Sequence, residues 1–448
     1  MVRPIETIGG VDGRVLRVTT LAASGPGSLD AALRTEGPRL VVFEVGGVID
    51  LGGRTLVVRS PHLTIAGQTA PDPGITLIRG GLIVETHDVV IQHLAVRPGD
   101  DGPAGKEWAP DALGVRRGSN VVFEHCSATW AVDENLSISG PADAEGPGAT
   151  SHDVTLRHCL IAEALSHATH PKGEHSKGTL VHDGVRNVRI TGCVYAHNRE
   201  RNPRVKGGAT AIVSDSVMYN WGSACVGVGA RGNRRMLAPA EVVLERNLAI
   251  AGPDTRGKVF VKSVDPGGRV SLRDNVVVGV AIADEGVVIV QHPSSAFGTF
   301  SPQAGRRALE GSVSRAPFSP GGEKVPKADE GLRSAGSRPA RRDPIDARII
   351  QSIIRGDGRI IDSQNEVGGY PVRAATARAV VVPKDRRAWL EALSKELAVD
   401  RALNVAPLWE RLKCHPERSE GSPESGDSSS SDAARNDTVS APSPGSQK

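Results

Sequence analysis

The segment from Asn198 to Gly208 holds the residue types that could most clearly do chemistry. It reads NRERNPRVKGG and carries four cations, Arg199, Arg201, Arg204 and Lys206. Guanidinium and ammonium groups bind carboxylates and phosphates, the first as a bidentate fork and the second as a point charge. Water, a nucleic acid or an acidic substrate could lie opposite such a strip, and the choice depends on the scaffold that carries it.

The overall composition narrows the range of partners. The chain has 54 Lys and Arg residues against 51 Asp and Glu residues, which leaves a net charge of +3 at pH 7. A general nucleic-acid binder needs a broad cationic excess, so we expect no nucleic-acid partner. No run approaches the ~18 apolar residues of a membrane span, so we expect no membrane partner. The 52 glycines and 3% aromatic content are typical of a turn-rich β architecture.

An imperfect repeat indicates what the scaffold is. Each copy alternates apolar and polar residues as a strand does and then passes into a turn or loop. Cys126, Cys159 and Cys193 occupy the same place in successive copies, 33 and 34 residues apart. The copies are VVIQHLAV from Val89, VVFEHCSA from Val121, VTLRHCLI from Val154 and VRITGCVY from Val188, followed by the weaker AIVSDSVMY from Ala211, VVLERNLAI from Val242 and VSLRDNVVV from Val270.

Repeated strands that lie too far apart in the sequence for hairpins indicate a solenoid. If each copy is one coil, like positions stack on neighbouring coils, and the three cysteines form an inward ladder of small buried side chains. The predicted fold class is therefore all-β, a parallel β-helix. A β-propeller is the rival, but it needs four strands in each repeat of about 40 residues and a signature that the chain lacks.

We predict a single β-helix domain over residues 1–410, monomeric, and a disordered low-complexity tail over residues 411–448. SGPGSLDAALRTEGP predicts a short N-terminal capping helix with Ser28 as its N-cap, because a β-helix must cover its open ends. The Gly/Pro/Ser-rich stretch from about 296 to 345 predicts a loop or linker. After it, DPIDARIIQSIIRGDGRIIDS predicts a short helix plus a strand, and DRRAWLEALSKELAV predicts an amphipathic helix that packs back on the solenoid.

Four motifs, in this order, resemble polysaccharide lyase family 1, the pectate lyases: VVFEHCSATWAVDENLSISG, HSKGTLV, HNRERNPRVKGG and VMYNWG. The most specific element is Arg-x-Pro-x-x-(Arg/Lys), here Arg201 to Lys206, and the likeness covers roughly residues 15–375. The resemblance implies a right-handed parallel β-helix and calcium-dependent β-elimination of polygalacturonate, an acidic polysaccharide. It also implies a secreted enzyme, although MVRPIETIGGVDGRV at the start contains no signal-peptide apolar core.

The chemistry that the resemblance implies gives the cations their roles. Elimination from a 4-linked uronate removes the weakly acidic proton at C5, and neutralising the adjacent carboxylate stabilises the anion that develops. The resemblance places Arg201 at the base position and Lys177 at that of a catalytic lysine, with Lys206 and Arg204 as substrate-binding cations. An arginine base requires a lowered pKa, because an ordinary guanidinium has a pKa above about 12.

The resemblance also implies Ca²⁺ as the cofactor, and Ca²⁺ takes oxygen ligands from several carboxylates. Asp111 and Asp133 match two ligands of the family. Ala109 stands where some members have a carboxylate, and Ser137 stands where an aspartate is usual. Glu134 is the best candidate to compensate, so the predicted metal site is Asp111, Asp133 and Glu134.

Other interpretations stay open beside the lyase. With a decayed calcium site the chain would be a non-catalytic polyuronate-binding β-helix, whereas a β-helical glycoside hydrolase would need closely placed acid and base carboxylates. The cationic strip could be a solvated turn, and Lys177 a plain surface lysine. His170 and His175 could bind a metal or titrate near neutral pH, but we expect ordinary loop histidines.

Overall fold

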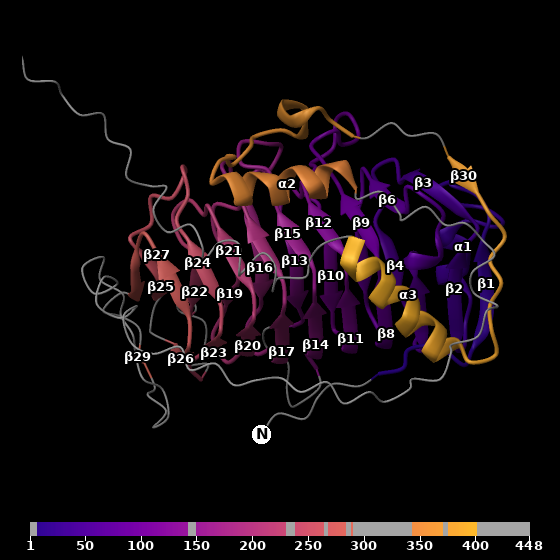
Figure 1. The fold of residues 1–448 in the computed structure, drawn as a ribbon, viewed down its shortest axis with the longest axis horizontal. Helices are drawn as coiled ribbons and strands as arrows, with labels where there is room; N and C mark the ends of the chain where they lie inside the picture. Colours follow the sequence, from indigo (N-terminus) through magenta and orange to yellow (C-terminus); the bar gives the residue numbers. More distant parts are fainter. Residues whose placement is uncertain are drawn as a thin grey trace, which may run out of the picture.

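The computed structural model describes residues 7–141, 149–229, 238–263, 268–283, 288–289, 343–370 and 375–400. Its strands wind into a stack of coils with three long sheets, and the helices lie on the outside of the stack (Figure 1). Successive strands of the chain enter the three sheets in turn, and the strands within each sheet pair in parallel. The all-β class and the parallel β-helix are therefore confirmed.

The first sheet follows the most regular part of the repeat. Its strands in spatial order are β1 (Arg14–Val18), β2 (Arg39–Phe43), β5 (Leu63–Ala66), β8 (His87–Gln92), β11 (Ser119–Glu124), β14 (His152–Arg157), β17 (Arg186–Thr191), β20 (Thr210–Ser214), β23 (Glu241–Glu245), β26 (Arg269–Arg273) and β29 (Val288–Ile289).

The second sheet carries or directly borders the predicted site residues. Its strands are β4 (Leu56–Val58), β7 (Leu82–Val84), β10 (Leu113–Arg116), β13 (Glu134–Ser139), β16 (Lys177–Val181), β19 (Arg204–Val205), β22 (Val226–Val228), β25 (Val259–Ser263) and β28 (Ala281–Ala283).

The third sheet bears a helix on its outer face. Its parallel strands are β3 (Val45–Asp50), β6 (Ile75–Ile78), β9 (Leu94–Arg97), β12 (Ser127–Thr129), β15 (Leu160–Ala162), β18 (Val194–Ala196), β21 (Val217–Tyr219), β24 (Leu248–Ile250) and β27 (Val276–Val278). A late strand, β30 (Thr376–Ala377), pairs antiparallel with β3 at the edge.

Each of the clearest repeat copies contains two short strands joined by a sharp corner. His93, His125 and His158 occupy the corner between the first and third sheets with φ of 55°, 51° and 53°, the left-handed region that redirects the chain. Their rings stack at centroid distances of 4.8 and 5.0 Å. Gly192 takes the next place in this row, and a Cβ there would lie 2.5 Å from Nδ1 of His158. The histidine stack therefore ends at a glycine.

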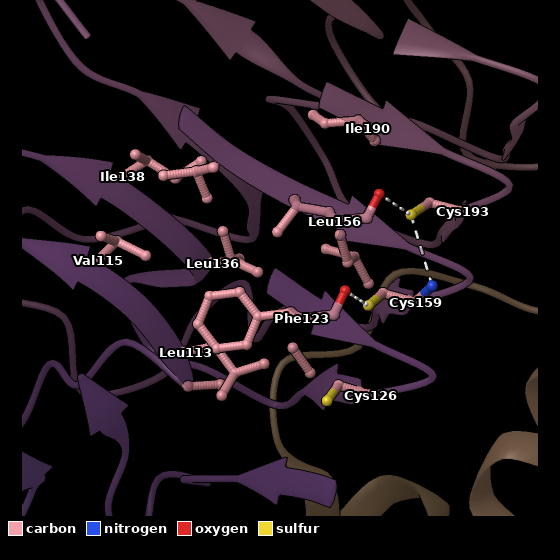
Figure 2. Packing of buried hydrophobic residues seen from close by; sticks show 14 of the residues in the cluster. Leu113, Val115, Phe123, Cys126, Leu136, Ile138, Leu156, Cys159, Ile190 and Cys193 are labelled. Carbon is pink, nitrogen blue, oxygen red and sulfur yellow. Dashed lines mark hydrogen bonds between the residues drawn. The ribbon is translucent and has the colours of Figure 1, made fainter. Parts of the chain in front are cut away.

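The cysteine ladder lies in the interior of the stack, as predicted (Figure 2). Cys126, Cys159 and Cys193 are buried free thiols among apolar residues such as Phe123 and Leu156. The backbone N–H of Cys159 donates to Sγ of Cys193 at 3.4 Å, which links one coil to the next. Burial raises the pKa of the Cys126 and Cys159 thiols well above the usual range, so these thiols stay protonated and unreactive.

The helix α1 (Leu29–Arg34) begins where the sequence predicts. Ser28 is its N-cap and accepts a hydrogen bond from the backbone N–H of Ala31 at 3.2 Å. Leu29 and Leu33 are buried in the main core, and α1 contacts β1 and β4. Its role as a cap for the end of the stack stays a prediction.

The C-terminal helices pack back on the coils. Helix α2 (Pro344–Arg355) lies across the outer face of the third sheet (Figure 1), where Ile345 and Ile349 join an apolar cluster with Trp130 and Leu160. Helix α3 (Arg386–Asp400) buries Leu390 against residues of the first coils. Two 3₁₀ turns, η1 (Gly67–Thr69) and η3 (Gln364–Val367), complete the helical segments of the described residues.

One element of this region was wrongly predicted. The sequence RIIDS after α2 was expected to form a strand, but residues 356–363 contain none. Ile361 is instead buried in the cluster beneath α2, and its carbonyl accepts a hydrogen bond from the Ser166 backbone at 2.9 Å. Residues 296–342 of the predicted loop and the whole tail 411–448 lie outside the described residues, and the single-domain boundary stays a prediction. No helix among the described residues is both long and apolar enough to cross a membrane.

Candidate active site

The second sheet brings the predicted site residues together from successive coils. Glu134 at the start of β13 lies in register with Lys177 at the start of β16, and Lys177 forms a bridge with Glu200 on the next coil. Asp111 and Arg201 lie just before β10 and β19 of the same sheet. Parallel strands in register stack like positions, so residues far apart in sequence meet at one edge of this sheet.

Three carboxylates form one cluster at this edge. Oxygens of Asp111, Asp133 and Glu134 all lie within 4.8 Å of one another. Asp111 accepts hydrogen bonds from the Glu134 backbone N–H at 3.0 Å and from the Ser137 hydroxyl at 2.5 Å. Asp133 precedes the strand β13, so the alternation of side chains along a strand does not separate it from Glu134. The predicted metal residues are thus neighbours, and Ser137 is a donor to Asp111.

The two aspartates of the cluster have opposite pKa shifts. Burial raises the pKa of Asp111 to about 7, and the charge of Asp133 adds to this effect. Burial also pushes the pKa of Asp133 upward, but the hydrogen bond and charge of His175 outweigh it, and the net pKa is lowered. One aspartate therefore holds a proton near neutral pH while the other stays ionised.

The raised pKa of Asp111 predicts a pH-dependent stability in the absence of metal. The unfolded pKa is about 3.9, so between about pH 4 and pH 7 the folded protein binds the extra proton, and its free energy of unfolding falls as pH rises. Across this window we expect the free energy of unfolding of the unmodified chain to fall by an amount on the order of 1–4 kcal/mol. In Asp111→Asn this fall should be absent. Denaturant titrations of both proteins with a chelator, at about pH 4.5 and about pH 7.5, measure it. Equal pH dependence in the two proteins would contradict the assignment.

Arg201 faces the carboxylate cluster and forms an ion pair with Glu134. Its side chain keeps 17% of its surface exposed, whereas that of Glu134 keeps 6%. Burial lowers the pKa of Arg201 to about 10, and the charge of Arg204 adds to this, while Asp133 and Asp111 oppose it. The guanidinium thus lies among the acids and is easier to deprotonate than an ordinary arginine.

Lys177 is buried and held by a carboxylate that the sequence analysis did not single out. Its Nζ donates to Glu200 at 2.9 Å, and Glu200 also accepts from the Ser223 hydroxyl at 2.6 Å. Burial lowers the pKa of Lys177, although Glu200 opposes this. Burial alone would raise the pKa of Glu200, but Lys177 and Ser223 bring it to about 2. The interpretation of Lys177 as a plain surface lysine is therefore excluded by its burial. Glu200 is added to the candidate site because it holds the Lys177 ammonium group.

The cationic strip has carboxylate partners along its length. Lys206 donates to the buried Asp183 at 2.5 Å, and Arg199 pairs with Glu174. Arg204 lies in β19, close enough to influence Arg201. Asp183 sits in the turn HDG, where the sequence gives no signal for a site; Glu200, by contrast, is part of the NRERNP strip itself.

The two histidines near Lys177 are not ordinary loop residues. Nε2 of His175 lies 2.7 Å from Asp133 Oδ1, and Nε2 of His170 lies 3.6 Å from the same oxygen. The rings stack at a centroid distance of 3.7 Å with 7° between their planes. Asp133, His170 and His175 also form a second group whose atoms could hold a metal ion.

Comparison with known proteins finds relatives of this chain that are named pectate lyases. The chain is 35% identical over 260 residues to a probable pectate lyase C of Aspergillus flavus, which covers 57% of this chain and 54% of that protein. It is 36% identical over 259 residues to the Aspergillus fumigatus protein of the same name, with the same coverage. Pectate lyase 3 of Ambrosia artemisiifolia is 27% identical over 258 residues, covering 51% and 59%. No family model matches the chain.

Solved structures show weaker likenesses. The cedar pollen allergen jun a 1 aligns with a TM-score of 0.48 and 16% identity over 65% of this chain and 84% of that one. A Bacillus sp. N165 pectate lyase in complex with trigalacturonate aligns with a TM-score of 0.40 and 12% identity, covering 67% and 93%. The chain spans about half the length of the curated relatives it matches. The resemblance to the pectate lyases that the motifs indicated is confirmed by these relatives.

Proposed function

We propose that this chain is a polysaccharide lyase that cleaves 4-linked galacturonan by β-elimination. The observation that carries the proposal is the convergence of Asp111, Asp133 and Glu134 with Arg201 at one edge of the second sheet. The curated relatives named pectate lyase support the same reaction class. The substrate is an acidic polysaccharide, which the cations of the edge suit by charge.

Each residue has a role that follows from its surroundings. Arg201, with a pKa lowered to about 10, removes the C5 proton. Lys177 and Lys206 bind uronate carboxylates as point charges, and Arg204 adds a guanidinium beside them. Substrate carboxylates must compete with Glu200 and Asp183 for the two lysines. The pairs keep the lysine side chains ordered before the substrate arrives.

The carboxylate cluster fits a divalent cation. Two aspartates that share a partly buried site, one with a raised pKa, repel each other unless a proton or a cation lies between them. Asp111 and Asp133 would hold Ca²⁺, with Glu134 available if it leaves Arg201. Bound there, Ca²⁺ would neutralise a substrate carboxylate and make the C5 proton more acidic. Because Ca²⁺ takes six to eight oxygens, water and substrate must supply those that Ala109 and Ser137 do not.

A retaining glycoside hydrolase is the second candidate, and the two aspartates favour it. Asp111 has a raised pKa and Asp133 a lowered one, as a general acid and a nucleophile require. Carboxyl groups of retaining enzymes lie about 5–5.5 Å apart, and these two have oxygens within 4.8 Å. Hydrolysis gives no role to Arg201, which is why the lyase is preferred.

One assay separates the candidates. With polygalacturonate and Ca²⁺, we expect an unsaturated product that absorbs in the ultraviolet, and we expect a chelator to abolish it. Reducing ends without an unsaturated bond would identify a hydrolase. Binding without either product would identify a non-catalytic polyuronate-binding protein. The surface variant Arg246→Ala serves as the unchanged control, because its arginine forms an exposed pair with Asp215 just past the ends of β23 and β20. Secretion and a monomeric state stay predictions.

A further inference from the structure

We propose that His175, supported by the stacked ring of His170, is a positioning residue that holds Asp133 in the orientation required for cation binding. The inference rests on the proposed function, since it concerns the same carboxylate cluster. It assigns the two histidines a role that the motifs do not give them.

The contact between His175 and Asp133 is short and buried. His175 Nε2 lies 2.7 Å from Asp133 Oδ1, and the histidine side chain is only 7% exposed. The ring of His170, at 2% exposure, lies flat against it and turns its own Nε2 toward the same oxygen at 3.6 Å. Two imidazoles therefore face one carboxylate oxygen, and the second ring fixes the plane of the first.

Both histidines could instead be metal ligands, and one hydrogen bond opposes that role for His170. The backbone N–H of Lys172 donates to Nδ1 of His170 at 3.1 Å, so Nδ1 carries a lone pair. In the neutral ring the proton is then on Nε2, the nitrogen that faces Asp133. A nitrogen that carries a proton cannot bind a metal. A metal-bound histidine usually donates its other N–H outward, which is the reverse of this arrangement.

The loop that carries the histidines is fixed by its own hydrogen bonds. The backbone N–H of His175 donates to Ser166 at 2.8 Å, and Ser176 donates to Leu165 at 2.9 Å. The Thr169 hydroxyl donates to the Trp108 carbonyl at 2.7 Å, which ties the loop to the segment that leads to Asp111. Because the loop is held at both ends, the ring of His175 is held in one orientation, with Nε2 directed at Asp133.

The hydrogen bonds to each aspartate determine which of its carboxylate lone pairs are left for a cation. Asp111 is fixed by the Ser137 hydroxyl and the Glu134 backbone, and Asp133 is fixed through Oδ1 by His175. Only the remaining lone pairs are available to a cation. Outer hydrogen bonds of this kind orient metal ligands, and their loss costs about 10–100-fold in metal affinity.

The test compares two substitutions of His175. Glutamine places an N–H donor at the reach of Nε2, whereas leucine fills the space without a donor. We expect His175→Leu to weaken Ca²⁺ binding by about 10–100-fold and His175→Gln to stay within a few-fold of the unmodified chain, both by titration calorimetry without substrate. His167→Leu is the matched control, because His167 lies on the same loop and pairs with Asp362 outside the cluster.

A second position keeps the test open if His175→Leu does not fold. His170→Phe preserves the stacked ring without its nitrogens and leaves the His175 donor in place, so it should weaken Ca²⁺ binding by less than the ~10–100-fold expected for loss of that donor. Equal Ca²⁺ affinity in His175→Leu and the unmodified chain overturns the positioning role and leaves the lyase proposal intact. Failure of the unmodified chain to bind Ca²⁺ overturns both. Tight Zn²⁺ binding that disappears in His170→Phe and His175→Leu would make the histidines ligands and reject the inference.

Discussion

Arg201→Lys is expected to lower kcat on polygalacturonate by about 10²–10⁴-fold, the range over which a general base contributes. Lysine keeps a positive charge beside Glu134, so the buried carboxylate stays paired and the fold is preserved. It loses the planar guanidinium that reaches the cluster. KM should change little, because Lys177, Lys206 and Arg204 still bind the substrate. Initial rates of unsaturated product, measured across substrate concentrations, separate kcat from KM.

The control for this variant lies two residues away. Arg199→Lys changes a cation of the same strip that pairs with Glu174 and has no assigned role, so its rate should stay within a few-fold. The rate of the unmodified chain should also rise with pH toward about 10, because the neutral form of Arg201 becomes more abundant. Retention of more than about a tenth of kcat in Arg201→Lys, well above the expected range, would exclude Arg201 as the base.

The coil architecture could be predicted because it is encoded in a repeated position. Cys126, Cys159 and Cys193 recur at one place in the copies, and stacking turns that recurrence into a buried ladder. The same logic explains why Asp111, Asp133 and Arg201 meet although they lie far apart in the sequence. A residue whose place within the repeat is known can therefore be assigned to a position on its coil from the sequence alone.

The parts of the site whose roles the sequence did not reveal lie outside the repeat. His170 and His175 belong to a loop between β15 and β16 whose path depends on bonds to Ser166 and Leu165, and no copy elsewhere shows where it folds. Asp183 is a single turn residue, and its pairing with Lys206 depends on the stacking of two neighbouring coils. Long-range pairing of isolated side chains leaves no periodic signal.

Helix α2 depends on a buried arginine, and Arg97→Met is expected to reduce the free energy of unfolding by about 3–5 kcal/mol. The Arg97 side chain is fully buried and pairs with Asp343 at 3.0 Å and Asp346 at 2.9 Å, both at the start of α2. Burial by itself lowers the pKa of Arg97, but the two carboxylates outweigh it and raise the pKa, so the charge is kept. Methionine fills most of the volume but leaves both acids without their cation. Guanidinium denaturation at neutral pH measures the loss.

Two further variants test whether the loss comes from the uncompensated acids. Arg97→Met combined with Asp343→Asn and Asp346→Asn should recover most of the stability, because replacing a whole buried ion network costs little. Arg246→Met breaks an exposed pair with Asp215 and should change stability by less than about 1 kcal/mol. If the triple variant is no more stable than Arg97→Met, packing rather than charge accounts for the effect.

Ile345 and Ile349 of α2 share one apolar cluster with Trp108 and Leu165. Loosening α2 should therefore also lower Ca²⁺ affinity at Asp133, since the loop that directs His175 rests on that cluster.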